Sequence, residues 1–494
     1  MKLFYFESKE KLFNHIVEHN DTIGKTLLLP TGTTPIGLYQ TMIKRKIDFS
    51  NTITFNLDEY YPSKSYNETS YHYYLWNNLF HHINIRLENI HLLNGNAADA
   101  DIECRRYNTL IQNNPIDIAF MGIGINGHIA FNEPGCKITD TTRLIELKEI
   151  TKRTNNVNYD KALTVGMAEI LASKKLVLMA IGETKNDIIY DFIHHTYKMP
   201  ATYLLNHRNV DLYVDKPAFS KVLNQLSPAF MQYNKILVFS PHPDDDVIGM
   251  GATIKKFIDA GKEVVVVYQT SGSNGGNKII RQKESIHALG LLGLDDTDNI
   301  IFGNTPFYNI KKQTTDFALD DPANLFAADS DILYTLNIIQ TINPDLIFFA
   351  GDICDPHKTH LTCHMIIQEC LQHLEWSIPA YNYYSAWYAP TEYSVKEFFS
   401  KELMQLKIAS IRAHASQLNP IFAGNLELDF YQIVAERNRK DACAITCADN
   451  DADTNTDTNA DNDADNDADT NADNDIYVEG FTSVSSSNIN AIAA

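Results

Sequence analysis

Short apolar runs alternate with longer amphipathic stretches in two separate zones of this chain, and this alternation constrains the fold more than any other feature. The runs of the first zone cover residues 26–30, 52–56, 116–124, 175–182 and 210–214. Runs of this length, rich in Val, Ile, Leu and Phe, are typical of strands buried on both faces of a sheet. The segments between them are long enough for crossover helices, so the zone predicts an α/β domain with a parallel sheet.

The second zone repeats the pattern, with apolar runs at 235–240, 262–270 and 344–351. It predicts a second domain of the same class, a mainly parallel, Rossmann-like sheet flanked by helices. The stretch 216–234 has mixed polarity and two prolines, as expected of a linker. We therefore predict one domain over residues 1–225 and another over residues 226–447.

Residues 448–475 contain only Asp, Asn, Ala and Thr. Such a segment has no large apolar side chain to bury and repels itself electrostatically, so it is predicted to be disordered. A calcium-binding loop is the alternative, but the glycine and the terminal glutamate of the EF-hand pattern are missing. Residues 476–494 begin with the apolar run IYVEGF, which we interpret as a closing strand followed by a tail.

The charge and the cysteines narrow the partners and the compartment. The formal charge is −21, and eleven of the acidic residues lie in the Asp-rich tract, which leaves an ordinary acidic protein of −10. Lys and Arg are not clustered as in nucleic-acid-binding proteins, and no apolar run has signal-peptide or membrane-span length. The seven cysteines are scattered without a disulfide framework. We expect a cytoplasmic protein without nucleic-acid or membrane partners. The sequence leaves open whether it forms a homo-oligomer.

Polar residues follow three strands of the first zone, where ligands bind in α/β sheets. Residues 30–35 form a loop of small residues that enters a helix, which is either a phosphate cradle or a plain tight turn. In the loop after the next strand, Asp58 is either a general base or a helix cap. The glycine-rich loop 122–134 carries Asn126, His128 and Glu133, which could form a relay that orients an imidazole.

These segments resemble the glucosamine-6-phosphate deaminase family. The matching motifs are LPTGTTP, TFNLDEY, NIHLLNGNA, GIGINGHIAFNEPG, KALTVGMAEIL and IGETK, and they follow the family's order over nearly all of residues 1–218. The resemblance implies conversion of glucosamine 6-phosphate, a small amino-sugar phosphate, to fructose 6-phosphate and ammonia. It implies neither a metal nor an organic cofactor for this domain.

The resemblance also implies roles for individual residues. Asp58 would move the C2 proton to C1, and His128 would assist ring opening while Glu133 and Asn126 hold it. The substrate phosphate would be bound by Gly32, Thr33, Thr34 and Lys185.

Two features depart from the family pattern. Some members carry Asp where this chain has Asn126. The segment 142–161, which should supply a mobile lid and a second phosphate-binding arginine, is shorter than expected, and Arg153 is the nearest candidate. Two other functions stay open for this fold, a 6-phosphogluconolactonase-like hydrolase and a sugar-phosphate-binding regulatory module.

The second zone has its own cluster of ionisable residues. The run 235–240 ends in PHPDDD, and the run 344–351 is followed by DPHKTH. Two imidazoles and a carboxylate at the ends of two parallel strands suit a hydrolytic zinc site. A simpler explanation of the Asp residues is that negative side chains stabilise the N-terminus of a helix. This explanation does not account for the histidines.

With RAHASQ at 412–417, these motifs resemble the zinc-dependent de-N-acetylases of the LmbE/PIG-L type. The resemblance implies Zn²⁺ bound by His242, Asp245 and His360, with Asp244 as the base and His357 stabilising the oxyanion. This family usually has Glu at the position of Asp246. The fusion then leads to a hypothesis of two successive steps on amino sugars, deacetylation followed by deamination.

Overall fold

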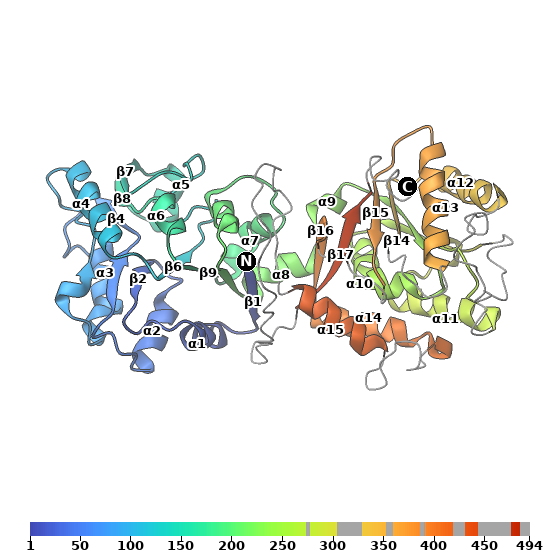
Figure 1. The fold of residues 1–494 in the computed structure, drawn as a ribbon, viewed down its shortest axis with the longest axis horizontal. Coiled ribbons are helices and arrows are strands. Elements are labelled where there is room, and N and C mark those ends of the chain that lie inside the picture. The colour runs from blue at the N-terminus through green and yellow to red at the C-terminus, as the bar shows by residue number, and fades with distance from the viewer. Residues whose placement is uncertain are drawn as a thin grey trace, which may run out of the picture. The chain divides into compact units, whose positions relative to one another are not determined.

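The computed structural model describes residues 1–272, 277–303, 329–351, 359–385, 390, 392–417, 430–442 and 476–484. The chain divides into two compact units, Met1–Val222 and a second unit that begins at Leu223 and includes Ile476–Ser483 (Figure 1). The division falls inside helix α8 (Lys216–Asn224), a few residues before the predicted boundary. Residues 448–475 and His357 lie outside the described residues, so the predictions on them stay predictions.

The first unit is built on a seven-stranded sheet in the order β1-β10-β9-β6-β2-β3-β5. Every neighbouring pair in this sheet is parallel, which confirms the predicted fold class. The strands at its two edges, β1 and β5, were not predicted from the sequence. The strands are β1 (Lys2–Phe6), β2 (Thr26–Leu29), β3 (Ile53–Asn56), β5 (Ile90–His91), β6 (Ile118–Gly122), β9 (Lys175–Ala180) and β10 (Val210–Asp215).

Alternate strand residues form the core beneath the first helices. Leu27 and Phe120, both fully buried, pack on one face of the sheet with apolar residues of α1 (Lys9–His19), α2 (Ile36–Lys44) and α3 (Tyr71–Asn78). The remaining helices of this unit are α4 (Ala100–Asn113), α5 (Glu149–Asn155), α6 (Met167–Leu171) and α7 (Asn186–Ile193).

A second, smaller sheet in this unit was not predicted. Strands β4 (Asp58–Tyr61), β8 (Lys161–Thr164) and β7 (Arg143–Glu146) pair in an antiparallel way. Asp58 lies opposite Thr164, so it begins a strand, and its predicted place in a loop was wrong. The run Asp-Glu-Tyr-Tyr has no apolar alternation, and only its pairing with β8 makes it a strand.

The second unit also contains a seven-stranded sheet, in the order β13-β12-β11-β14-β15-β17-β16. Five neighbouring strands are parallel and β17 is antiparallel to both of its neighbours, so the predicted mainly parallel sheet is confirmed. The strands are β11 (Lys235–Ser240), β12 (Glu263–Tyr268), β13 (Ile300–Phe302), β14 (Leu346–Ala350), β15 (Ala380–Tyr383), β16 (Val395–Ser400) and β17 (Ile476–Ser483).

Helices cover both faces of this sheet, as Figure 1 shows. Ile236 and Val238 belong to a core with residues of α10 (Asp245–Asp259), α11 (Lys278–Leu291), α14 (Lys401–Arg412) and α15 (Phe430–Ala442). Leu237 and Phe239 point to the other face, where they pack with α12 (Asp329–Ile342) and α13 (Thr359–His373). This alternation along β11 is what a strand buried on both faces requires.

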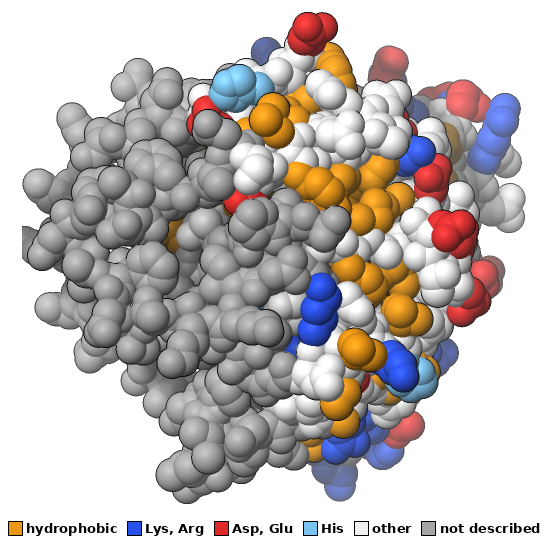
Figure 2. Space-filling model, turned by 90° about the vertical axis from the view of Figure 1, so that its right-hand side faces the viewer, with side chains coloured by type: hydrophobic (Ala, Val, Ile, Leu, Met, Phe, Trp, Pro, Cys, Tyr) orange, Lys and Arg blue, Asp and Glu red, His pale blue; other side chains and the backbone are white. Residues whose placement is uncertain are grey.

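Among the described residues on the face shown in Figure 2, basic, acidic and apolar side chains are all exposed, and Lys and Arg gather toward its lower edge. Within the part of the chain that the structure describes, no helix has the length and apolar character needed to cross a bilayer.

Candidate functional site

In both large sheets the order in which the chain adds strands reverses at one point, and ligands commonly bind at such a point. In the first unit the chain passes from β2 outward to β5 and then returns to β6 on the other side of β2. In the second unit it passes from β11 to β13 and returns to β14 on the other side of β11. A crevice forms beyond the carboxyl ends of the two strands that flank such a switch point. The polar loops predicted from the sequence follow these strands.

Asp58 is a buried carboxylate at the first switch point, where the residue is 6% exposed. Burial and the neighbouring Glu59 raise the pKa of Asp58 to about 8, and Thr31 Oγ1 donates a hydrogen bond of 3.4 Å to its Oδ1. Glu59 points elsewhere and accepts hydrogen bonds from Ser70 Oγ and the backbone N–H groups of Tyr71 and His72. Asp58 is therefore a carboxyl group that can exchange a proton near neutral pH.

A hydrogen-bonded relay follows β6. Asn126 Oδ1 lies 2.7 Å from Nδ1 of His128, and Asn126 Nδ2 donates to Oε2 of Glu133 at 2.7 Å. Because a carboxylate only accepts, the amide nitrogen faces Glu133 and the amide oxygen is left for the imidazole. His128 therefore carries its proton on Nδ1, and Nε2 is the basic nitrogen. The structure brings together the three residues predicted for this relay.

The backbone around the relay depends on glycine. A Cβ at Gly124 would collide with the imidazole of His128, and Gly127 has a φ of +78°. Burial lowers the pKa of His128, while the charge of Glu133 raises it and the charge of Lys185 lowers it. Lys185, in the short 3₁₀ turn Glu183–Lys185, is thus close enough to act on the imidazole.

The predicted phosphate loop lies at the same switch point. Gly32 has a φ of +89°, which favours glycine, and its carbonyl accepts a 2.5 Å hydrogen bond from Tyr74 Oη. Thr33 is exposed, and Thr34 is half-buried, with its side chain close to the last residue of β6, Gly122. Arg153, the candidate for a second phosphate ligand, lies exposed on α5.

Sequence reasoning missed the aromatic residues beside Asp58. Tyr60 is stacked on Tyr159 at 4.7 Å between ring centres, and its hydroxyl lies 3.0 Å from that of Tyr71. The negative charge of Asp58 contributes to the raised pKa values of both Tyr60 and Tyr71, after burial, so both hydroxyls lie near it. The motif TFNLDEY contained Tyr60, but its polar environment depends on segments that are distant in the sequence.

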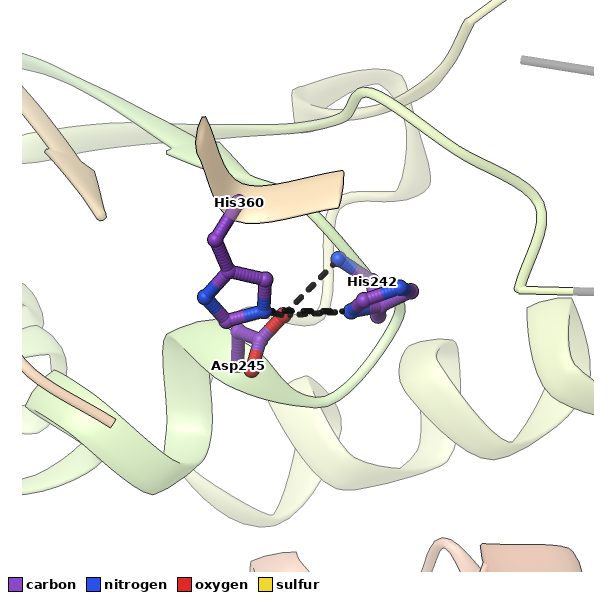
Figure 3. A group of neighbouring side chains, drawn as sticks. All are labelled: His242, Asp245 and His360. Atoms are coloured by element: carbon purple, nitrogen blue, oxygen red, sulfur yellow. Dashed lines mark hydrogen bonds and ion pairs between the residues drawn. The ribbon is translucent and has the colours of Figure 1, made fainter. Parts of the chain in front are cut away.

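At the second switch point three predicted ligands converge (Figure 3). His242 comes from the loop after β11, Asp245 from the first turn of α10 and His360 from the first turn of α13. Oδ2 of Asp245 lies 3.0 Å from Nδ1 of His242 and 3.0 Å from Nε2 of His360. Although burial raises it, the pKa of Asp245 is held well below its usual range by the two imidazoles. One ligand atom from each residue lies within 4.8 Å of the others, which a single cation can bridge.

Asp244, the predicted base, lies beside this group. Nη2 of the buried Arg281 lies 3.1 Å from its Oδ2, and Nη1 of the same arginine donates to the carbonyl of Gly272 at 2.8 Å. The sequence did not reveal Arg281. His414 of the RAHASQ motif is 2% exposed. Burial lowers its pKa, and the negative charge of Asp244 acts in the opposite direction.

Asp246, where a glutamate is usual, points away from the three converging ligands. It accepts hydrogen bonds from Ser240 Oγ at 3.2 Å and from Tyr268 Oη at 3.1 Å. Burial raises its pKa to about 7. The shorter side chain is thus accommodated by two hydroxyl donors of neighbouring strands.

Each of the two units matches a known protein family. The family "Glucosamine-6-phosphate isomerases/6-phosphogluconolactonase" matches residues 9–214, and the PIG-L family, "GlcNAc-PI de-N-acetylase", matches residues 237–371. A glucosamine-6-phosphate deaminase of Thermoanaerobacter sp. (strain X514) is 43% identical over 39% of this chain and 82% of its own length. Another, of Clostridium botulinum (strain Alaska E43 / Type E3), is 41% identical over 44% of this chain and 96% of its own length.

Two solved structures each resemble a part of the chain. A monomeric glucosamine-6-phosphate deaminase has 33% identity and a TM-score of 0.43, over 44% of this chain and 99% of its own. The N,N'-diacetylchitobiose deacetylase of Pyrococcus horikoshii has 22% identity and a TM-score of 0.37, over 55% of this chain and 92% of its own. By its sequence relatives and family matches, this chain belongs in its first unit to the glucosamine-6-phosphate deaminase family and carries a PIG-L (LmbE-type) de-N-acetylase domain in its second.

Proposed function

We propose that the first unit deaminates glucosamine 6-phosphate to fructose 6-phosphate and ammonia. The observation that carries the proposal is the combination of a buried carboxyl group, Asp58, with the relay of His128, Asn126 and Glu133 at one switch point. An aldose–ketose isomerisation needs these two kinds of group, one to move a proton between carbons and one to open the ring. Family membership at 43% identity supports the same reaction.

The residues act in sequence in this proposal. Nε2 of His128 assists the proton transfer at the ring oxygen that opens the sugar. The Asp58 carboxylate then takes the proton from C2 and returns it to C1, which converts the amine-bearing carbon to an imine. Water adds to this imine, and the C–N bond breaks to release ammonia and leave the ketone. The loop Gly32–Thr34 and the cationic Lys185 hold the phosphate, for which a backbone turn and a lysine are suited.

The first test is an assay of the whole chain with glucosamine 6-phosphate. We expect ammonia and fructose 6-phosphate in equal amounts, with no loss of rate after treatment with a metal chelator. The lactonase and sensor alternatives predict other outcomes. A lactonase would release acid from 6-phosphogluconolactone in place of ammonia, and a sensor would bind the sugar phosphate and turn over neither substrate.

We further propose that the second unit is a zinc-dependent de-N-acetylase acting on an N-acetylated amino sugar. Two imidazole nitrogens and one carboxylate oxygen within 4.8 Å are the donor set that hydrolytic zinc sites use. All three ligands come from segments that the sheet fixes, at the end of β11 and the starts of α10 and α13. These residues fit the metal that the PIG-L family match implies.

Zinc would supply a Lewis acid and a water of lowered pKa at this position. Asp244 would accept a proton there and pass it to the leaving amine. Arg281, with its 3.1 Å ion pair, would hold the Asp244 carboxylate in one orientation. His357 would bind the oxyanion by analogy with the family.

A substitution of one ligand tests the metal site directly. We expect the His360→Ala variant to retain no zinc after dialysis against a chelating resin, whereas the unmodified protein retains about one zinc per chain. His373→Ala is the matched control, because His373 is exposed at the other end of the same helix. Metal content is measured by elemental analysis, and circular dichroism checks the fold. Equal zinc in both variants would rule out the proposed ligand set.

The fusion supports a proposed order of reactions, deacetylation by the second unit followed by deamination by the first. The zinc-loaded chain supplied with N-acetylglucosamine 6-phosphate should then release acetate and ammonia. Acetate without ammonia would show that the second unit accepts this substrate but that deamination does not follow. Neither product would leave the C-terminal substrate to another N-acetylated amino sugar.

A further inference from the structure

Helix α5 connects two parts of the first site that lie far apart in the sequence. Thr151, in the middle of the helix, is 2% exposed, and its hydroxyl donates a short hydrogen bond to Oε1 of Glu133. Asn155, in the last turn, donates from Nδ2 to the hydroxyl of Tyr60 at 3.1 Å. Lys148, which precedes the helix, donates to the carbonyl of Pro134 at 2.8 Å. One short helix thus contacts the relay loop and the strand that carries Asp58.

Of these contacts, only that of Thr151 reaches a member of the relay. Glu133 has two carboxylate oxygens, and each has a different donor. Oε1 receives the hydroxyl of Thr151, and Oε2 receives the amide of Asn126. With both oxygens engaged, the carboxylate cannot rotate without losing a hydrogen bond in a site where Glu133 is only 8% exposed.

The orientation of Glu133 decides the orientation of the next group. Asn126 presents its NH₂ to Glu133 and therefore its oxygen to His128 Nδ1. An asparagine, unlike an aspartate, can turn over and present its NH₂ to the imidazole. The proton would then leave Nδ1, and the tautomer that offers Nε2 as the base would be lost. A relay with an asparagine in the middle needs a fixed carboxylate behind it.

We infer that Thr151 is a positioning residue of the first site, whose hydroxyl fixes Glu133 and through it the amide of Asn126 and the tautomer of His128. The inference rests on the proposed deaminase function. Thr151 touches no reacting atom and acts on the ring-opening step through Glu133. The short segment 142–161 thereby contributes to the reaction through α5, although its Arg153 lies exposed.

The test is the Thr151→Val variant, which keeps the shape of the side chain and removes the hydroxyl. We expect kcat for glucosamine 6-phosphate to fall by about 10- to 100-fold, as is typical when a buried residue that orients an active-site group is removed. KM should change little, because the phosphate loop is untouched. Thr151→Ser restores the hydroxyl and should recover most of kcat.

Thr154→Val is the matched control on the same helix. Its hydroxyl is exposed and, among the described residues, donates to the carbonyl of Ile150 within α5, so kcat should stay at the level of the unmodified protein. If Thr151→Val also keeps its kcat, or if Thr151→Ser does not recover it, the inference is wrong and the deaminase proposal stands. An unmodified protein without ammonia release would instead overturn the deaminase proposal itself.

Discussion

Replacing Asp58 by Asn is expected to lower kcat for glucosamine 6-phosphate deamination by about 100- to 10,000-fold, the range that a positioned general base contributes. An amide of the same shape occupies the same buried place in β4 but cannot accept a proton from C2. The release of ammonia and fructose 6-phosphate measures the effect. Asp187→Asn, the same exchange at an exposed position of α7, should keep full activity.

The pH dependence of the unmodified enzyme provides a second expectation for Asp58. Burial and Glu59 raise its pKa to about 8, and a base must be ionised to act. We therefore expect kcat/KM to decline below pH 8, by about tenfold for each further pH unit. A rate that is flat from pH 6 to 8 would contradict the assignment of Asp58 as the base.

The free energy of unfolding should fall as pH rises, whereas kcat/KM should rise. Measuring both therefore distinguishes a loss of catalysis from a loss of folding. The pKa of Asp58 in the folded protein lies above its value of about 3.9 in the unfolded chain. The folded state thus holds a proton that the unfolded chain releases between about pH 4 and pH 8, and the free energy of unfolding falls as pH rises through this window. Asp58→Asn lacks this loss, so at pH 8 its Tm should be at least that of the unmodified protein.

The sequence predicted the parts of the fold that depend on local pattern. Five apolar runs form strands of one parallel sheet, namely β2, β3, β6, β9 and β10. Each strand is buried on both faces, and a continuous apolar run in the sequence indicates such burial. The site loops were found for the same reason, since they follow these strands. The edge strand β5 has only two residues and left no such signal.

Features that depend on distant partners could not be predicted. Asp58–Tyr61 reads as a polar loop until β8 supplies its hydrogen-bonding partner. The contact of Thr151 with Glu133 joins residues 18 positions apart, and nothing in either local sequence indicates it. Arg281 reads as a helix-surface residue, yet it is buried and bound to the carboxylate of Asp244.

A buried ion pair in the second unit is another feature that the sequence does not indicate. Lys407 of α14 and Glu479 of β17 have side chains with no exposed surface, and Nζ lies 2.6 Å from Oε1. Read from the sequence, a lysine and a glutamate belong to the protein surface. Glu479 also accepts hydrogen bonds from the N–H groups of Ala252 and Thr253 in α10, and Lys407 donates to Asn438 of α15.

We expect this pair to help specify the register of β17. The strand follows residues 443–475 in the chain and enters the sheet between β15 and β16, antiparallel to both. A shift of β17 by one residue would turn Glu479 to the opposite face, away from Lys407 and the amides of α10. Burying two charges costs free energy that only this register offsets, so the pair acts against misplaced pairings of the strand.

Lys407→Met should therefore destabilise the second unit by about 3–5 kcal/mol, because it leaves the buried carboxylate of Glu479 without its ion-pair partner. Urea unfolding followed by circular dichroism measures this change, and deaminase activity reports that the first unit stays folded. Lys255→Met is the matched control. Lys255 pairs with Asp259 on the surface of α10, so its loss should cost no more than about 1 kcal/mol.

The double variant Lys407→Met/Glu479→Gln distinguishes the ion pair from simple packing. Removing both charges leaves neither partner of this pair as an uncompensated buried ion, so the double variant should be less destabilised than the sum of the two single variants. If the losses instead add, the two residues stabilise the sheet independently. If Lys407→Met costs as little as Lys255→Met, the register of β17 is set by its backbone pairing with β15 and β16 and by the packing of Phe481, without the charges.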